Sequence, residues 1–193
     1  PRGCHDPRLP YGFRARPEPD LCRGSNVVSR PVILTLDLAT RFGWCVGELD
    51  SGQPEFGAGF FAPEGSRDDA IFAGAFKWTV ENMQKFKVNR VRIEEPLDPR
   101  QMGKFTNRKT FERLYGIPSA VRAACYLCKC YDVAYTPASK VRASLSLKGV
   151  KKGEWKERVM WAVQARGFDC TDNDAADALA LWLHSNDTFR VST

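Results

Sequence analysis

The sequence has no apolar run of the length that crosses a lipid bilayer, which takes about 18 or more consecutive apolar residues. It also has no internal repeat, and its one segment of biased composition lies at the start. Hydrophobic residues make up 43% of the chain and charged residues 27%, which is usual for a globular fold. A membrane-spanning protein is therefore not expected, nor is a chain disordered over its whole length.

A second close pair of cysteines is also missing beside the cluster Cys125-x-x-Cys128-x-Cys130. A structural zinc site needs four ligands, typically from two such pairs. The seven cysteines are an odd number and no signal peptide is evident, which argues against a secreted disulfide scaffold. We expect free thiols in a reducing compartment, with a zinc or redox role for the cluster as the alternative.

Acidic residues are outnumbered, with 23 Asp and Glu against 29 Lys and Arg, which gives a net charge of +6. This excess favours a polyanionic partner, first nucleic acid and second an anionic membrane surface. Residues 1–30 carry five prolines and six arginines without the period of a helix or a strand. We predict a poorly packed arm over 1–30 and one folded domain over 31–193.

From Pro31 on, the hydrophobic pattern is typical of an α/β domain. Strands are predicted at 32–38, 43–49, 56–62, 91–95 and 132–136, and helices at 68–86, 110–131, 153–166 and 173–186. The helix at 110–131 is expected to be interrupted or kinked near Pro118. The order βββαβαβα excludes a Rossmann chain, which alternates strand and helix from its start. It predicts a mixed five-stranded sheet flanked by helices, the ribonuclease-H-like fold.

Two of the predicted strands end in carboxylates. Asp37 lies in a run of Val, Ile and Leu, where an isolated buried carboxylate costs several kcal/mol unless it is paired or binds a metal. Glu94 and Glu95 follow Val91 and Ile93 in the same way. The alternatives are a strand-end cap for Asp37 and an exposed strand terminus for the two glutamates.

A third acidic group lies on the last predicted helix. Asp174 and Asp177 are three residues apart and therefore share a helix face, where two like charges repel. A position in the first helical turn would explain Asp174 alone. Asp177 has only alanine, leucine and tryptophan around it from Ala175 to Leu183, so helix capping does not account for it.

Carboxylates from two strands and one helix suit a magnesium site. Mg²⁺ binds carboxylate oxygens and keeps its other positions for water and phosphate. Two such ions about 4 Å apart activate a water and stabilise the leaving oxygen in phosphodiester hydrolysis. The sequence therefore predicts a metal-dependent phosphodiesterase centre if these acids converge in the fold.

The acidic segments resemble the three motifs of RuvC-type Holliday-junction resolvases. They are 36–44 (LDLATRFGW), 92–95 (RIEE) and 174–180 (DAADALA), within a similarity that covers roughly residues 31–187. The last motif is the most specific of the three. The resemblance implies that Asp37, Glu94, Asp174 and Asp177 bind the metal, and that Glu95 is a bystander. It also implies two Mg²⁺ or Mn²⁺ ions per active site and a homodimer that nicks two strands of a four-way DNA junction.

Basic residues precede the last motif. Between 140 and 158, basic residues outnumber the two glutamates; they are Lys140, Arg142, Lys148, Lys151, Lys152, Lys156 and Arg158. Such a stretch neutralises DNA phosphates, and the alternative is a solvated helix face. By the resemblance, Arg142 and Lys156 are the closest matches to basic residues of the family, and Lys156 would stabilise charge in the transition state.

The segment after the glutamate motif departs from the family. Family members carry an aromatic residue there that wedges into the junction, whereas this chain has Pro96-Leu97. The longer loop that follows, 98–109, adds four basic residues and an aromatic one, namely Arg100, Lys104, Phe105, Arg108 and Lys109. We predict that this loop contacts DNA and that Phe105 or Met102 acts as the wedge.

The sequence thus predicts a junction-resolving endonuclease of bacterial or phage type, located in the cytoplasm with the nucleoid, with an organellar location left open. One alternative is a YqgF-type nuclease of the same fold that acts on RNA. Another is a junction-binding module without catalysis, which the four intact acids disfavour. A sugar-kinase or actin-like ATPase would need a second such domain, and 193 residues are too few for that.

Overall fold

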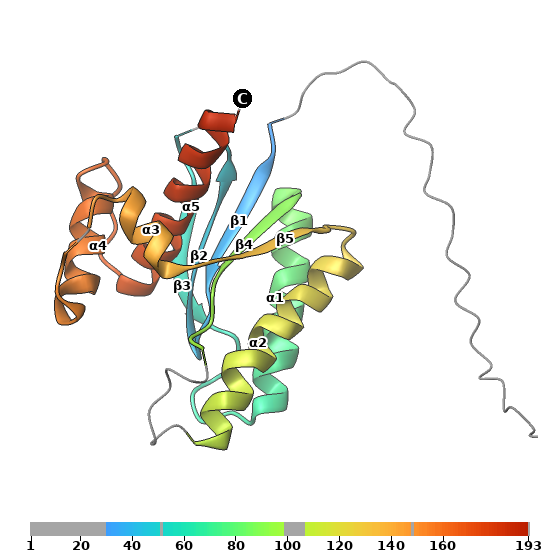
Figure 1. The fold of residues 1–193 in the computed structure, drawn as a ribbon. Coiled ribbons are helices and arrows are strands. Elements are labelled where there is room, and N and C mark those ends of the chain that lie inside the picture. Colours follow the sequence, from blue (N-terminus) through green and yellow to red (C-terminus); the bar gives the residue numbers. More distant parts are fainter. Residues whose placement is uncertain (1–29, 51, 99–106, 148, 193) are drawn as a thin grey trace, which may run out of the picture.

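The protein is described here from a computed structural model, which covers residues 30–50, 52–98, 107–147 and 149–192 (Figure 1). Residues 1–29, including most of the predicted arm, lie outside the described part of the chain. The proposed division into an arm and a nuclease domain therefore stays a prediction.

One mixed sheet of five strands forms the centre of the fold. In chain order the strands are β1 (Val32–Asp37), β2 (Arg41–Glu48), β3 (Glu55–Phe60), β4 (Arg90–Glu94) and β5 (Asp132–Thr136). Their order across the sheet is β3-β2-β1-β4-β5. The first three strands pair antiparallel, and β1 pairs parallel with β4, which pairs parallel with β5. The central position of β1 buries it on both faces, as its continuous apolar run predicts.

Helices cover both faces of this sheet (Figure 1). They are α1 (Asp68–Phe86), α2 (Arg108–Leu127), α3 (Ala138–Ser144), α4 (Trp155–Gln164) and α5 (Asn173–Ser192), with a short 3₁₀ turn at Lys152–Glu154. The pair α1 and α2 packs on one face, and α5 packs on the other, with α3 and α4 outside it. None of the helices in the described ranges combines the length and hydropathy that a bilayer crossing requires.

Alternation along β1 divides the interior into two cores. Leu34 and Leu36 face α1 and α2, whereas Ile33 faces α5. Thr35 shares the α5 face, where its buried hydroxyl donates a hydrogen bond of 2.7 Å to the carbonyl oxygen of Ala178. This bond joins the middle of β1 to α5, so the first turns of α5 lie over the end of β1.

From Ala175 to Leu183, α5 is unusual in that every residue except Asp177 is buried. Ala175, Ala176 and Ala178 to Leu183 are each at most 9% exposed, because the sheet covers one side of the helix and α3 and α4 cover the other. The alanines allow a close approach of helix and sheet. Asp177 is therefore held in an apolar environment, as the sequence predicts.

The predicted fold class is confirmed, with three differences in detail. Helix α2 continues through Pro118, so the expected interruption is wrong, and it ends at Leu127 rather than near residue 131. Helix α5 extends beyond the predicted end at residue 186. The short α3 was not predicted, because its seven residues carry no clear apolar period and begin directly after Pro137, which also ends β5.

Candidate active site

Four carboxylates gather where β1 and β4 end. Asp37 is the last residue of β1 and Glu94 the last of β4, and these strands are parallel neighbours, with Leu36 opposite Ile93. Asp174 and Asp177 lie in the first turns of α5 over the same sheet face. Parallel strands finish at one edge of a sheet, so the two strand-end acids meet there and α5 adds the other two.

Gly43 sets the distance between α5 and the sheet. It lies opposite Asp37 in the register of β1 and β2. A Cβ atom added at Gly43 would lie 1.8 Å from the carbonyl oxygen of Asp174, far inside van der Waals contact. Only glycine therefore allows the backbone of β2 to approach the first turn of α5 this closely.

Gly43→Ala is expected to force α5 away from the sheet and to destabilise the fold by about 2 kcal/mol, the usual cost of overpacking. Calorimetry should show a lower Tm, and any activity that depends on Asp174 and Asp177 should fall with it. Gly59→Ala is the matched control, because its Cβ would meet the Phe42 ring at 3.5 Å, an ordinary contact. Equal stability of the two variants would contradict this account of Gly43.

Burial and mutual repulsion raise the pKa values of three of the four acids. Burial raises the pKa of Asp37 to about 6, Asp174 adds to the shift, and Lys156 opposes it. Burial raises the pKa of Glu94 to about 8, and the charges of Asp37 and Asp177 raise it further. Burial raises the pKa of Asp177 to about 7, again with a contribution from Asp37. The four acids thus interact electrostatically with one another and concentrate negative charge at one point.

Arg41 is the residue of this site that sequence reasoning missed. It is the first residue of β2, and its guanidinium forms ion pairs with both Asp172 and Asp174. Asp172 in turn caps α5, since its Oδ1 accepts hydrogen bonds of 3.0 Å from the backbone amides of Asp174 and Ala175. These contacts hold the pKa of Asp172 below its usual value. Only the close packing of β2 on α5 reveals the pairing.

Two predicted basic residues also reach the acids. Lys156, on α4, places its Nζ 3.7 Å from Oδ1 of Asp174 and lowers the pKa values of Asp37 and Asp177. Arg142, on α3, lowers the pKa values of Glu94 and Asp177, and its guanidinium stacks 4.5 Å from the centre of the Trp155 ring. Both residues thus lie near the acids, and the roles that the resemblance implies for them stay predictions.

The remaining predicted DNA contacts are scattered. Arg108, at the start of α2, is exposed and pairs with Glu112 at 2.6 Å, and Lys109 beside it is also exposed. Lys140 lies on α3 and Lys151 is exposed before the 3₁₀ turn that includes Lys152. Outside the described residues lie Arg100, Lys104, Phe105 and Lys148. The predicted wedge and loop contacts therefore stay predictions.

A cavity of about 1020 Å³ opens beside the acids. Glu94 and Arg142 line it together with Arg122 and Tyr115 of α2. Glu95 also lines it and is exposed, whereas Glu94 is the partly buried residue that interacts with the other acids. The two glutamates thus differ in burial and in their interaction with the other acids, a difference that strand alternation alone did not predict.

No protein-family model and no curated protein sequence matches the chain. Among solved structures it is similar to RuvC of Thermus thermophilus (TM-score 0.63, 16% identity), over 84% of this chain and 97% of that one. It is also similar to T. thermophilus RuvC in complex with a Holliday junction substrate (TM-score 0.67, 18% identity), with the same coverage. A third similar structure is the yeast mitochondrial Holliday junction resolvase (TM-score 0.55, 12% identity), over 82% of this chain and 80% of that one.

These similarities confirm the RuvC-type, ribonuclease-H-like fold that the acidic motifs and the element order predict. They extend over most of each chain. At identities of 12–18% these similarities establish the fold alone. The reaction has to follow from the residues of the site.

Proposed function

We propose that this protein is a metal-dependent DNA endonuclease that resolves four-way junctions by hydrolysing a phosphodiester in each of two strands. The observation that carries the proposal is the convergence of Asp37, Glu94 and Asp177 with raised pKa values on one sheet edge. Structural carboxylates are normally paired with cations, and a cluster that instead raises its own pKa values is characteristic of a functional site.

The donor set suits Mg²⁺, with Mn²⁺ as a substitute, and two ions per site are proposed. All four groups are carboxylates, the ligands that hard divalent cations prefer. Within the described residues, no three Asp, Glu, His or Cys side chains are close enough as they stand to enclose an ion. In this structure Arg41 forms an ion pair with the carboxylate of Asp174, so a cation at the site would compete with it. When bound, the ions would supply an activated water and charge stabilisation at the leaving oxygen.

The protein residues around the acids have defined roles in this proposal. Asp37, Glu94, Asp174 and Asp177 hold the metal and position it from three secondary-structure elements. Lys156 faces Asp174 and is placed to stabilise the negative charge that develops on the phosphate. Arg142 interacts with Glu94 and lines the cavity beside the acids, where it would bind a neighbouring phosphate of the same strand.

The proposed substrate is branched DNA, bound by a homodimer. Paired incision needs two active sites, and the described part of each chain contains one set of four acids. Tyr126 and Leu127 at the end of α2 and Tyr131 before β5 are exposed, each by 64% or more. An apolar patch of this kind suits contact with a second copy of the chain. The T. thermophilus protein of the same fold has been captured with a Holliday junction substrate, which supports the choice of DNA.

The proposed function is tested by Mg²⁺-dependent cleavage of a synthetic four-way junction beside a linear duplex, a single strand and an RNA–DNA hybrid. Symmetric nicks in the junction, lost in Asp37→Asn, are the expected result. Cleavage of RNA-containing substrate instead would favour the YqgF-type alternative. Tight junction binding without cleavage in any metal would favour the non-catalytic module and overturn the proposal.

Arg41→Gln is expected to lower the Mg²⁺ concentration that gives half-maximal cleavage by about threefold or more, because the substitution removes a cation that competes for Asp174. A metal titration of the cleavage rate measures this. Arg67→Gln is a matched control, since that arginine is exposed and pairs with Asp69 at the start of α1. A higher Mg²⁺ requirement in Arg41→Gln would show that the arginine positions Asp174 for the metal instead.

A further inference from the structure

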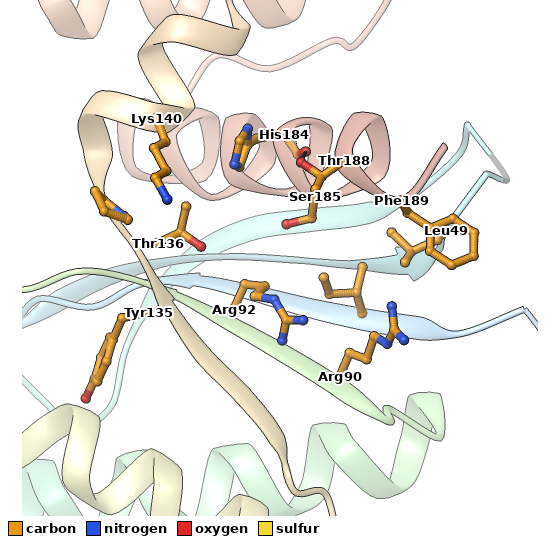
Figure 2. Close-up of a pocket in the computed structure, with 12 residues that line it drawn as sticks. Leu49, Arg90, Arg92, Tyr135, Thr136, Lys140, His184, Ser185, Thr188 and Phe189 are labelled. Atoms are coloured by element: carbon orange, nitrogen blue, oxygen red, sulfur yellow. Dashed lines mark hydrogen bonds between the residues drawn. The ribbon is translucent and has the colours of Figure 1, made fainter. Parts of the chain in front are cut away.

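A second cavity, of about 440 Å³, lies between the C-terminal half of α5 and the strands β4 and β5 (Figure 2). The residues that give it its chemistry are Arg90, Arg92, Thr136, Lys140, His184 and Ser185. They come from β4, β5, α3 and α5. No residue of the catalytic proposal lines this cavity, and it adjoins the one beside Glu94, since Tyr135 and Pro137 line both.

Permanent positive charge reaches this cavity from two elements, with Arg90 and Arg92 on β4 and Lys140 on α3. Arg90 and Arg92 alternate with Val91 on β4, so both side chains lie on the α5 face of the sheet. Figure 2 shows Lys140 and His184 pointing from α3 and α5 toward the strands, with Arg92 on the sheet beneath them. The walls contain these three permanent cations and, within the described residues, no carboxylate.

One nearby carboxylate shows that the arginines accept an oxyanion. Asp132, the first residue of β5, lies 2.7 Å from Nη1 of Arg92 and 3.0 Å from Nε of Arg90. A single carboxylate thus serves two guanidinium groups, and Lys140 adds a third cation that acts on His184. Burial lowers the pKa of His184, with Lys140 contributing and Asp187 opposing, so its imidazole offers a neutral hydrogen-bonding edge at pH 7.

We propose that this cavity binds a phosphate group. A phosphate oxyanion matches the fork of donors on a guanidinium, and a lysine and side-chain hydroxyls complete its usual set of partners. Thr136 supplies such a hydroxyl on the walls, and Ser185 carries a second one, which in this structure donates to the carbonyl oxygen of Leu181. Asp132 shows that the two guanidinium groups can bind one oxyanion together, and a phosphate has more acceptor oxygens than a carboxylate, so it can also use Lys140 and the wall hydroxyls.

Two sources share this chemistry, namely a backbone phosphodiester of bound DNA and a terminal or free phosphomonoester. Arg92 and Glu94 lie on the same face of β4, two residues apart, which is about 7 Å along a strand. A DNA strand that reaches the proposed active site therefore passes close to the cavity. The backbone source rests on the proposed function, whereas the monoester source does not.

His184 provides a local probe, because it is one of two histidines in the chain and the other is His5. We expect inorganic phosphate, added to the full chain in the presence of a metal chelator, to shift the imidazole proton resonance of His184 saturably in NMR spectra. The spectrum of His184→Gln assigns the resonance. No saturable shift would overturn the proposal.

Two variants test the role of the cations. Lys140→Gln should require about tenfold more phosphate for half-saturation, since a charge-assisted hydrogen bond is lost. Asp132→Asn should require less, because the competing carboxylate is neutralised. Lys77→Gln on α1, an exposed lysine on the opposite side of the sheet, is the matched control. Equal effects of Lys140→Gln and Lys77→Gln would overturn the proposal.

The source of the phosphate is distinguished with short oligothymidylates with and without a 5′-phosphate. A shift of the His184 resonance with both would assign the site to the DNA backbone, and a shift with the phosphorylated form alone would assign it to terminal monoesters. Either result supports phosphate binding. The NMR assay contains chelator and measures no cleavage, so a negative result in it does not contradict the proposed nuclease function. Conversely, absence of junction cleavage does not contradict phosphate binding in this cavity.

Discussion

Asp177→Asn is expected to reduce Mg²⁺-dependent junction cleavage by about a thousandfold or more while junction binding is retained. Asp177 lies within the buried first half of α5, and its charge interacts with those of Asp37 and Asp174. Asparagine keeps the shape of the side chain but removes the anionic oxygen that a divalent cation needs. Cleavage rates under single-turnover conditions and gel-shift titrations with Ca²⁺ measure the two properties separately.

Glu95→Gln is the matched control for this loss. Glu95 is also an acid at the end of β4, but it is exposed, and its backbone amide donates a 2.9 Å hydrogen bond to Thr136. We expect cleavage within about threefold of the wild type. An inactive Glu95→Gln protein beside an active Asp177→Asn protein would refute the assignment of the four metal-binding acids.

Cleavage at limiting Mg²⁺ is expected to rise at least about tenfold between pH 6 and pH 8. In the metal-free protein, the pKa values of Asp37, Asp177 and Glu94 are about 6, 7 and 8, so the cluster still holds protons at neutral pH. A divalent cation binds the deprotonated carboxylates and must displace those protons. Titration calorimetry in buffers of different ionisation enthalpy should therefore detect proton release that decreases toward pH 8.

The same pKa values set the pH dependence of metal-free stability. Glu94 has a pKa of 4.5 as an unperturbed group and about 8 in the fold, so between these values the folded chain keeps a proton that the unfolded chain has lost. The stabilising effect of that proton is complete below about pH 4.5 and is lost as the pH rises through 8. The free energy of unfolding contributed by Glu94 therefore falls with increasing pH over this window.

Glu94→Gln removes this pH-dependent contribution, because glutamine resembles the protonated acid at every pH. We expect the variant to be as stable as the wild type near pH 4.5 and more stable by about 1–3 kcal/mol at pH 8. Thermal unfolding of both proteins in chelator gives the difference in stability directly. The pH-dependent contributions of other groups, such as His184, are common to both proteins and cancel in this difference. A variant that is less stable than the wild type at pH 8 would contradict the proposed repulsion among the acids.

Local sequence pattern was sufficient for most of the elements. The predicted helix at 68–86 and strand at 132–136 match α1 and β5, because each combines a clear period with a terminating residue. It was insufficient for α3, whose seven residues are held by contact with α5 rather than by their own pattern. It also allowed for an interruption at Pro118, which is instead buried within a continuous α2.

The amino-acid sequence by itself determined which acids are costly to bury. A carboxylate in an apolar strand or helix is unfavourable wherever the chain places it, so Asp37, Asp177 and the pair Glu94-Glu95 were identifiable before any fold was known. The order of strands and helices likewise restricted the topology, since short links and right-handed crossovers allow few arrangements.

Only the tertiary structure decided how these residues face one another. The pairing of Arg41 with Asp172 and Asp174 depends on the close approach of β2 to α5 at Gly43. The separation of Glu94 from Glu95 depends on which face of β4 packs against α5. The gathering of Arg90, Arg92 and Lys140 around one cavity depends on contacts between segments about 50 residues apart, which no local period encodes.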